Sequence, residues 1–253
     1  MPVETDPRIM RRLSELRLVI GFLTRFPAAA AAGPLAAASW AFPLGGVLVG
    51  ACAAIVYALA VQLGLTALLA GALAVASAVL ASGALHEDGL ADLADALGVR
   101  GDAQAKLAAM RASGIGSFGT LALGFAAGIK VVALAGLTQP AQVAPALIAS
   151  HAGARALLPW LMHREPWARS DGLAVDAGRP SLPQAAAALG IGLAILLVAA
   201  GPGRGLLAAA VALLALLVAP LARRQIGGIT GDVLGAAEQA AEIAILLALV
   251  ASR

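Results

Sequence analysis

Residues 67–95 read ALLAGALAVASAVLASGALHEDGLADLAD, and the abrupt change at residue 86 decides how this chain can fold. From Phe26 to Leu85 no residue is Asp, Glu, Lys or Arg, so sixty consecutive positions are uncharged. Four carboxylates then appear within ten residues. Because about 20 apolar residues cross a bilayer as a helix, this segment predicts membrane spans that end at a charged boundary.

Three of these carboxylates share one face of a predicted helix. Asp88, Asp92 and Asp95 stand at positions i, i+4 and i+7, where like charges repel one another. A bound cation would turn that repulsion into coordination, and oxygen-only ligands suit Mg²⁺ or Mn²⁺. The alternative is a solvated helix face just outside the bilayer. His86 would coordinate or orient a ligand, or form an interfacial hydrogen bond, while Glu87 points off the aspartate face.

The composition of the whole chain is that of a polytopic membrane protein. Its 253 residues are 61% hydrophobic and 12% charged, with a mean hydropathy of +0.92, well outside globular usage. We expect an all-α fold and a single integral membrane domain over residues 1–253. The net charge of +3 is better explained by anionic lipid than by nucleic acid, since the basic, aromatic-interleaved stretches of nucleic-acid-binding folds are absent. Cys52 is the only cysteine, which excludes a disulfide framework and a thiolate metal site.

Apolar segments of helix length predict a bundle of about six to seven transmembrane helices between residues 41 and 251. The seven candidates are 41–62, 65–85, 115–137, 140–162, 183–201, 205–222 and 233–251. Residues 1–27 hold five arginines among apolar residues at helical spacing, which predicts an N-terminal interfacial amphipathic helix and no cleavable signal. Glycines four residues apart, Gly46 with Gly50 and Gly124 with Gly128, predict close packing between spans.

The distribution of Lys and Arg predicts the orientation in the membrane. Thirteen of the 17 lie in four segments, which are 1–27, 86–114, 163–182 and 223–232. Of the other four, Arg204 lies in a loop between two of these segments, Arg253 lies at the C-terminus, and Lys130 and Arg155 lie within spans. Since cytoplasmic loops hold the excess of positive charge, we expect the N-terminus in the cytoplasm and the C-terminus outside. The acids of residues 86–95 and a second acidic group at the start of the seventh span, Asp232, Glu238 and Glu242, then both lie on the cytoplasmic side.

A glycine-rich segment precedes the third predicted span. Residues 114–119, GIGSFG, match the letters of the dinucleotide fingerprint, but no strand precedes them, so a Rossmann reading fails. Amides at a helix start, here near Gly116 and Gly119, favour phosphate, and Arg111 and Ser113 lie just upstream. The alternative is a flexible glycine hinge at the bilayer surface.

A second glycine-rich segment, residues 227–232, precedes the seventh span, with Thr230 as the predicted N-cap. Glu242 follows within the membrane, where an acid is costly and is by default a functional residue. Its predicted partners are the two cations within spans, Lys130 and Arg155. A purely structural ion pair with one of them is the alternative.

Taken together, these residues resemble the cobalamin synthase family, and the resemblance runs through nearly the whole chain in order. The motifs that carry it are TRFP at 24–27, FPL at 42–44, HEDGLADLAD at 86–95, MRASGIGSFG at 110–119, Lys130, and GGITGDVLGAAE at 227–238. The resemblance implies a transferase integral to the bacterial inner membrane, with its active site on the cytoplasmic face. It would join adenosylcobinamide-GDP to α-ribazole, or to its 5′-phosphate, with Mg²⁺ and with release of GMP.

The resemblance also implies roles for particular residues. Those expected to be catalytic are Asp88, Asp92, Asp95, Asp232 and Glu238. Those expected to hold Mg²⁺ are Asp88, Asp92, Asp95 and Asp232. Those expected to bind substrate are His86, Arg111, Ser113, Gly116, Gly119, Lys130, Arg155, Thr230 and Gly231. Beyond substrates and the lipid bilayer, the expected partners are a second copy of the chain or other enzymes of the corrinoid pathway.

Four positions depart from the family's usual pattern. Ala112 and Gly114 stand where the family has Asp and Arg. Ile229 stands in place of Gln, and His151 in place of Arg. Arg155 lies one turn after His151, so it is placed to supply the charge that His151 lacks.

Two other functions are alternatives. The aspartate motif also resembles that of the CDP-alcohol phosphotransferases, which would keep the site and change the acceptor. A transporter would line its path with Lys130, Arg155 and Glu242, but the two halves of related topology that this requires are not evident in the sequence.

Overall fold

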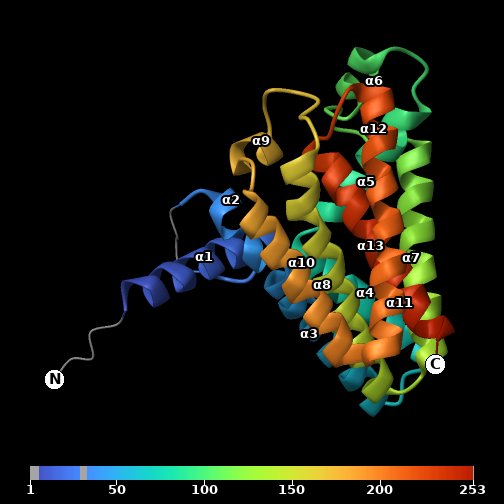
Figure 1. Ribbon diagram of the computed structural model, residues 1–253. Helices are drawn as coiled ribbons and strands as arrows, with labels where there is room; N and C mark the ends of the chain where they lie inside the picture. Colours follow the sequence, from blue (N-terminus) through green and yellow to red (C-terminus); the bar gives the residue numbers. More distant parts are fainter. Residues whose placement is uncertain (1–5, 29–32, 253) are drawn as a thin grey trace.

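The computed structural model describes residues 6–28 and 33–252, so predictions that concern residues 1–5 and Arg253 lie outside the described residues. The described part is helical, and its only β-type pairing is an isolated bridge between Trp167 and Ile229. The helices are α1 (Pro7–Leu23), α2 (Leu35–Ala38), η1 (Ser39–Ala41), α3 (Phe42–Gln62), α4 (Ala67–Ser82), α5 (Leu85–Gly98), α6 (Ala103–Ala109), α7 (Ser117–Leu137), α8 (Pro140–Arg164), α9 (Leu173–Ala177), α10 (Leu182–Ala200), α11 (Pro202–Ala212), η2 (Leu213–Leu217), α12 (Val218–Ile226) and α13 (Gly231–Ala251). The predicted all-α class is confirmed, and Figure 1 shows the long helices side by side in one bundle.

Five segments of the described chain are long and apolar enough to cross a membrane. They are 35–62, 117–137, 182–200, 202–226 and 231–251. The predicted span 65–85 appears as α4, which joins α5 at a bend of 93°, and the two helices together make a sixth candidate. The protein is therefore an integral membrane protein with five or six apolar spans.

The predicted span 140–162 is the exception, because α8 is not apolar enough to count as a span. This helix of 25 residues carries His151 and Arg155, and both side chains are buried. It packs against α3, α10 and α13, so neighbouring helices rather than lipid surround its polar side chains. The sequence predicted this helix correctly, but its hydropathy does not meet the criterion for a span.

Only one of the two predicted glycine pairs packs against another helix. A Cβ atom on Gly50 would lie 2.6 Å from the carbonyl oxygen of Leu147, and Gly46 is in similarly close contact with His151, so α3 touches the backbone of α8 at both glycines. The spacing of Gly124 and Gly128 misled the prediction, because a Cβ atom there would meet nothing within 4 Å. Small residues allow close approach, but they do not require it.

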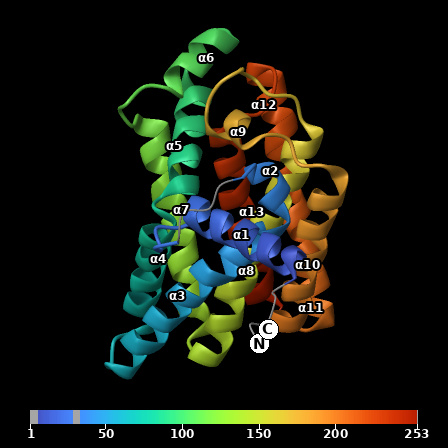
Figure 2. The same cartoon turned by 90° about the vertical axis from the view of Figure 1, so that its left-hand side faces the viewer.

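Helix α1 is amphipathic, as predicted, and it lies across the flank of the bundle (Figure 2). Val19 and Leu23 are buried, whereas Ile9 and Met10 are about half exposed, at 53% and 50%. The buried Glu15 accepts hydrogen bonds from Trp40 Nε1 (2.7 Å) and from two α1 arginines, Arg11 (2.9 Å) and Arg12 (2.8 Å). Burial raises the pKa of the Glu15 carboxyl, but these three hydrogen bonds lower it, and the net result is a pKa below the usual range.

We expect Glu15→Gln to destabilise the protein by about 1 kcal/mol at neutral pH, because a charged acceptor of three hydrogen bonds becomes neutral. A carboxyl whose pKa is lowered by folding stabilises the fold above its unfolded pKa and loses that effect as the pH falls through its folded pKa. Wild type should therefore approach the variant in thermal midpoint on acidification, measured in detergent micelles. Arg17→Gln, at an exposed position of the same helix, is the control. An equal gap between wild type and Glu15→Gln at pH 3 and pH 7 would contradict the assignment.

Candidate active site

Helices α5 and α13 touch through glycines, and this contact builds the site. A Cβ atom on Gly89 would lie 2.8 Å from the carbonyl oxygen of Asp232, and one on Gly235 would lie 2.9 Å from that of His86. Any larger side chain at either position would force the helices apart. The acidic segment of α5 and the start of α13 are thus neighbours, which brings Asp232 beside the aspartates of α5. We call the end formed by residues 86–116, 164–181 and 223–232 the polar pole.

Four aspartates gather at the polar pole. Asp88, Asp95 and Asp232 all act electrostatically on Asp92, with Arg169 as the opposing charge. Asp88 is exposed and the others are partly buried. The side-chain oxygens of Asp88 and Asp92 make no hydrogen bond or ion pair with any other described residue. The predicted aspartates therefore lie close enough to one another to interact, and two of them have free carboxylate oxygens, which are the ligands that a divalent cation prefers.

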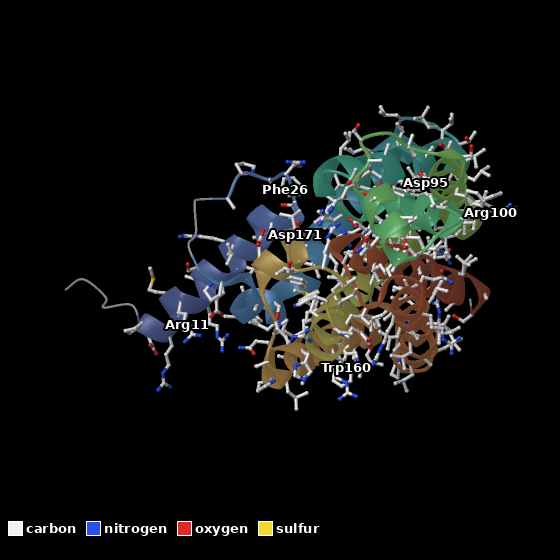
Figure 3. All side chains as sticks on the ribbon, turned by 90° about the horizontal axis from the view of Figure 1, so that it is seen from above. Arg11, Phe26, Asp95, Arg100, Trp160 and Asp171 are labelled. Atoms are coloured by element: carbon white, nitrogen blue, oxygen red, sulfur yellow. The ribbon has the colours of Figure 1, made fainter. Side chains whose placement is uncertain are left out.

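Asp95 has a different environment from the other aspartates. Its carboxylate accepts hydrogen bonds from the backbone N–H groups of Gly116 (2.6 Å) and Gly119 (2.8 Å), at the start of α7. The anion at this helix start is therefore a carboxylate of the chain itself, which corrects the prediction that Gly116 and Gly119 contact phosphate. The glycines are required because Cβ atoms at both positions would collide with Asp95. Figure 3 looks down on this end of the molecule, with Asp95 labelled.

The loop after α8 brings a cation, Arg169, to the cluster. Ala168 N–H donates to Ile229 O (2.9 Å), and Ile229 N–H donates to Pro166 O (2.8 Å), so this loop is clamped to the segment before α13. The clamp places Arg169 Nη2 3.6 Å from Asp232 Oδ2. In the sequence, Arg169 is one of the cations of segment 163–182, and no local motif distinguishes it from the others.

Arg111 lies at the edge of the polar pole, as predicted, but it is exposed and paired. Its Nη2 lies 2.6 and 2.8 Å from the two carboxylate oxygens of Asp171. Ser113 is exposed too, and its hydroxyl has no hydrogen-bond partner among the described residues. Both side chains can therefore turn toward a ligand at the pole without breaking a buried contact.

The start of α13 has the predicted cap. Thr230 Oγ1 accepts from the N–H of Val233 (3.3 Å) and donates to Asp232 Oδ2 (3.1 Å), so it orients an aspartate of the cluster. Gly231 is the first residue of the helix. Thr230 is buried, which makes it a residue that positions Asp232.

Below the polar pole, a buried network holds Lys130. Its Nζ lies 3.0 Å from Glu242 Oε1 and 4.0 Å from Glu87 Oε1, and it donates to Gln239 Oε1 at 2.8 Å. Gln239 Nε2 in turn donates to Glu87 Oε1 (3.1 Å) and Glu238 Oε2 (2.9 Å). Lys130 therefore has acidic or polar partners on both α5 and α13.

Arg155 forms the other half of this network. Its Nη1 lies 2.5 Å from Glu238 Oε1, and the same nitrogen donates to the carbonyl oxygen of His151 at 3.1 Å. Arg155 Nη2 lies 3.3 Å from His86 Nδ1. His151 Nδ1 lies 3.2 Å from Glu242 Oε2, which joins the two halves.

These contacts correct three predicted roles. Lys130 (4% exposed), Arg155 (1%) and Glu238 (0%) are enclosed and bound to the chain's own groups. A charge inside a membrane protein needs a partner there, so these residues pair with each other and do not reach a ligand at the pole. The predicted ion pair of Glu242 with Lys130 is present. No pattern in the sequence indicates Gln239, Glu87 points off the aspartate face, and His151 stands out only as a departure from the family pattern.

Among the described residues, one set of three candidate metal ligands converges within 4.8 Å, and it lies in the buried network. The set is His151, Glu238 and Glu242. The two glutamates already pair with Arg155 and Lys130, so a metal ion would have to displace buried cations. Of the aspartates of the polar pole, Asp88 and Asp92 have no hydrogen-bond or ion-pair partner among the described residues, whereas Asp95 and Asp232 do. Because Mg²⁺ keeps several waters and uses few carboxylates, this cluster suits it better.

Fold and site together define a polytopic integral membrane enzyme whose carboxylates gather at one end of a helical bundle. The chain belongs to the family described as cobalamin-5-phosphate synthase, whose model matches residues 15–250. A protein of Bradyrhizobium diazoefficiens is 46% identical over 94% of both chains, and one of Mesorhizobium japonicum is 44% identical over 93% of this chain and 92% of its own. A protein of Ralstonia nicotianae is 38% identical over 93% and 94%. All three are named adenosylcobinamide-GDP ribazoletransferase, and no solved structure matches significantly.

We expect Gly89→Val to destabilise the protein by about 1–3 kcal/mol, because the new side chain collides with the backbone of α13. The separation of α5 from α13 should also reduce any activity that depends on Asp88 and Asp232 together. The thermal midpoint in detergent is the measurement. Gly128→Val, where nothing lies within 4 Å, is the matched control and should unfold like wild type. Equal loss in both variants would show that the contact at Gly89 is not special.

Proposed function

We propose that this protein joins adenosylcobinamide-GDP to α-ribazole, or to its 5′-phosphate, and releases GMP with the help of Mg²⁺. Membership of the family and the names of its relatives support this reaction. The observation that supports a site for this reaction is the partly exposed cluster of Asp88, Asp92 and Asp232 beside Arg169. Carboxylates for a metal ion and a guanidinium for phosphate are what displacement at a diphosphate requires.

Asp88, Asp92 and Asp232 are the residues that would hold Mg²⁺, and Asp95 keeps its predicted place as a further ligand beside them. When bound, the metal ion neutralises charge on the diphosphate and on the leaving GMP. Arg169 and the exposed Arg111 bind phosphate oxygens. The hydroxyl oxygen of the ribazole attacks the phosphorus that carries the cobinamide, the bond from that phosphorus to the GMP oxygen breaks, and the hydroxyl proton passes to a carboxylate.

We propose that Asp232 is the carboxylate that accepts the proton of the attacking hydroxyl. Asp232 and Glu238 were both expected to be catalytic, and of the two only Asp232 lies in the aspartate cluster. Glu238 is fully enclosed and paired with Arg155. Thr230 holds the Asp232 carboxylate in place by donating to Oδ2.

We further propose that the polar pole faces the cytoplasm and that the membrane is the bacterial inner membrane. The cation-rich segments 86–114, 163–182 and 223–232 contribute to the polar pole, whereas Arg204 lies at the far end near Leu249. The excess of positive charge on one side supports this orientation. Self-association, or association with other corrinoid-pathway enzymes, stays a prediction.

The alternative functions have less support. Lys130, Arg155 and Glu242, which a transporter would use to line its path, are tied into one buried network. A CDP-alcohol phosphotransferase would use the same aspartates, but the family match favours the ribazole acceptor.

We expect Asp92→Asn to lower the rate of GMP release by about 100-fold or more, because it removes a carboxylate from the metal site. The measurement is mass spectrometry of products from membranes supplied with adenosylcobinamide-GDP, α-ribazole and Mg²⁺. Asp102→Asn is the control, since Asp102 is an exposed helix cap and Asn caps equally well. Wild-type rates in Asp92→Asn would refute the metal role.

Chelation by EDTA should abolish GMP release by the wild-type protein, and excess Mg²⁺ should restore it. The physical reason is that the aspartates of the cluster repel the diphosphate unless a cation lies between them. Product formation that persists after chelation and dialysis would contradict the proposed cofactor.

A further inference from the structure

The first turn of α5, which leads into the aspartate cluster, begins without a local anchor. Helix α5 follows α4 at a bend of 93°, and the two residues at the bend, Gly83 and Ala84, have φ values of +69° and +59°. Ala84 is the N-cap of α5, and it supplies no side-chain hydrogen bond. The local sequence therefore does not fix how α5 is rotated about its own axis, and tertiary contacts have to do so.

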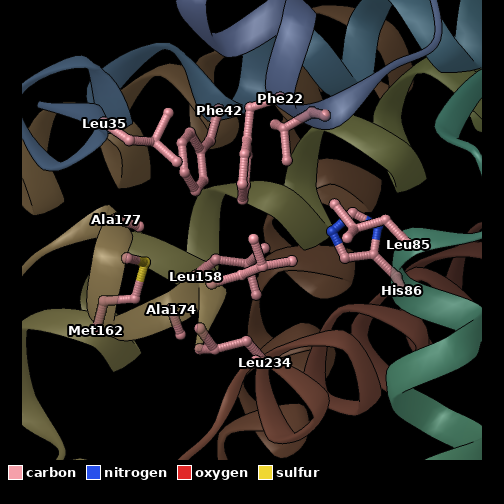
Figure 4. A pocket seen from close by; sticks show the side chains of 13 residues that line it. Phe22, Leu35, Phe42, Leu85, His86, Leu158, Met162, Ala174, Ala177 and Leu234 are labelled. Atoms are coloured by element: carbon pink, nitrogen blue, oxygen red, sulfur yellow. The ribbon is translucent and has the colours of Figure 1, made fainter. Parts of the chain in front are cut away.

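Apolar packing restrains this rotation little. On one side of the turn, Leu85 and His86 border an apolar cavity of about 70 Å³, together with Phe42 and Leu158 (Figure 4). Unfilled space makes no contacts that would resist rotation. On the side of α13 the contact is made at Gly89, which has no side chain to interlock with its neighbour. The rotation of α5 thus depends on polar contacts.

Two polar side chains of the first turn hold it to the bundle. His86 Nδ1 lies 3.3 Å from Arg155 Nη2, and Glu87 Oε1 accepts a hydrogen bond of 3.1 Å from Gln239 Nε2. The second contact is the shorter one, and it belongs to the residue directly before Asp88. Of the two, it is therefore the contact closer to the cluster.

The amide of Gln239 has only one possible orientation. Lys130 Nζ can only donate, so it has to meet the amide oxygen, at 2.8 Å, and the amide nitrogen then faces α5. That nitrogen uses its two protons on Glu87 Oε1 and on Glu238 Oε2, at 2.9 Å. Gln239 is 1% exposed. It is thus a fixed donor, and what it requires at position 87 is an acceptor.

A small rotation of α5 would be enough to spoil the cluster. Side chains reach about 5 Å from a helix axis, so a rotation of about 20° moves the carboxylate of Asp88 or Asp92 by about 2 Å. Functional side chains have to be held to within about 0.5 Å, and Mg²⁺ demands near-ideal octahedral geometry. The helix can therefore stay folded and still lose its metal-binding geometry.

We propose that Glu87, held by Gln239, is a positioning residue that fixes the rotation of α5 and with it the metal-binding geometry of Asp88 and Asp92. Glu87 acts through these aspartates and is not itself a metal ligand, because its side chain is 16% exposed and points into the bundle. The inference rests on the proposed function, which assigns the divalent cation to the aspartates.

The test is Mn²⁺ binding to the purified protein in detergent without substrates, followed by electron paramagnetic resonance. Glu87→Met removes the acceptor and keeps the length, so it should weaken Mn²⁺ binding by about tenfold or more, the usual effect of losing a group that orients metal ligands. Glu87→Gln keeps an acceptor for Gln239 and should bind Mn²⁺ nearly as wild type does. Gln142→Met, at an exposed position of α8, is the control and should equal wild type. Equal losses in Glu87→Gln and Glu87→Met would make Glu87 a ligand and overturn the proposal.

Gln239→Met is the second variant, and it tests the same contact from the other helix. It should weaken Mn²⁺ binding as well, and adding Glu87→Met to it should weaken binding little further, because both substitutions break one contact. Additive losses would contradict the proposal. A merely structural role predicts lower thermal midpoints with unchanged Mn²⁺ constants, and that result would also overturn it.

Turnover supplies a separate readout. The Mg²⁺ concentration for half-maximal GMP release should rise in Glu87→Met by the same factor as the Mn²⁺ constant, while kcat at saturating Mg²⁺ stays near that of wild type. If wild type forms no GMP, the proposed reaction fails, and the Mn²⁺ constants of the variants still decide the positioning role. Mn²⁺ binding by wild type that Asp92→Asn leaves unchanged would overturn both the metal site and the role of Glu87.

Discussion

The buried ion pairs between α13 and its neighbours are the constraint on which the rest of the structure depends. Glu238 and Glu242 on α13 meet Arg155 of α8 and Lys130 of α7 inside the bundle. Removing one partner of such a pair costs about 3–5 kcal/mol, because the other charge stays buried without compensation. The four helices α5, α7, α8 and α13 therefore have one relative arrangement that satisfies all of these groups, and that arrangement places the aspartates.

Helix α5 divides its acids between two environments. Glu87 points into the bundle, toward Lys130 and Gln239, while Asp88 is exposed and Asp92 half-buried at the polar pole. Neighbouring residues on a helix point about 100° apart, so one turn can serve both the interior and the site. The glycine contact of α5 with α13 keeps this turn in place, and it holds Asp232 beside the α5 aspartates. Stability and site geometry are thus coupled through a single turn.

The departures from the family pattern have different structural explanations. His151 and Arg155 both point into the buried network, so Arg155 supplies the cation that His151 does not. Ile229 is fully buried, and its backbone forms the bridge to the loop that carries Arg169. Because these are backbone hydrogen bonds, the apolar side chain of Ile229 does not disturb them. Gly114 is exposed and has open space around it, and nothing in the structure explains the absence of an arginine there.

The sequence by itself determined the membrane class, the helices and the acidic segment, because hydropathy and helical spacing are local properties. It also predicted that Thr230 caps a helix. The charge distribution and the family resemblance predicted that the aspartate motif lies close to Asp232. It assigned Lys130 and Arg155 to substrate binding and Glu238 to catalysis, because the same residue types occur in buried ion pairs and in ligand sites. Only the tertiary structure decided these roles. It also showed that the backbone N–H groups at the start of α7 bind Asp95 and that Arg169 lies beside Asp232. Each of these depends on a contact between residues more than 20 positions apart, and packing alone sets such distances.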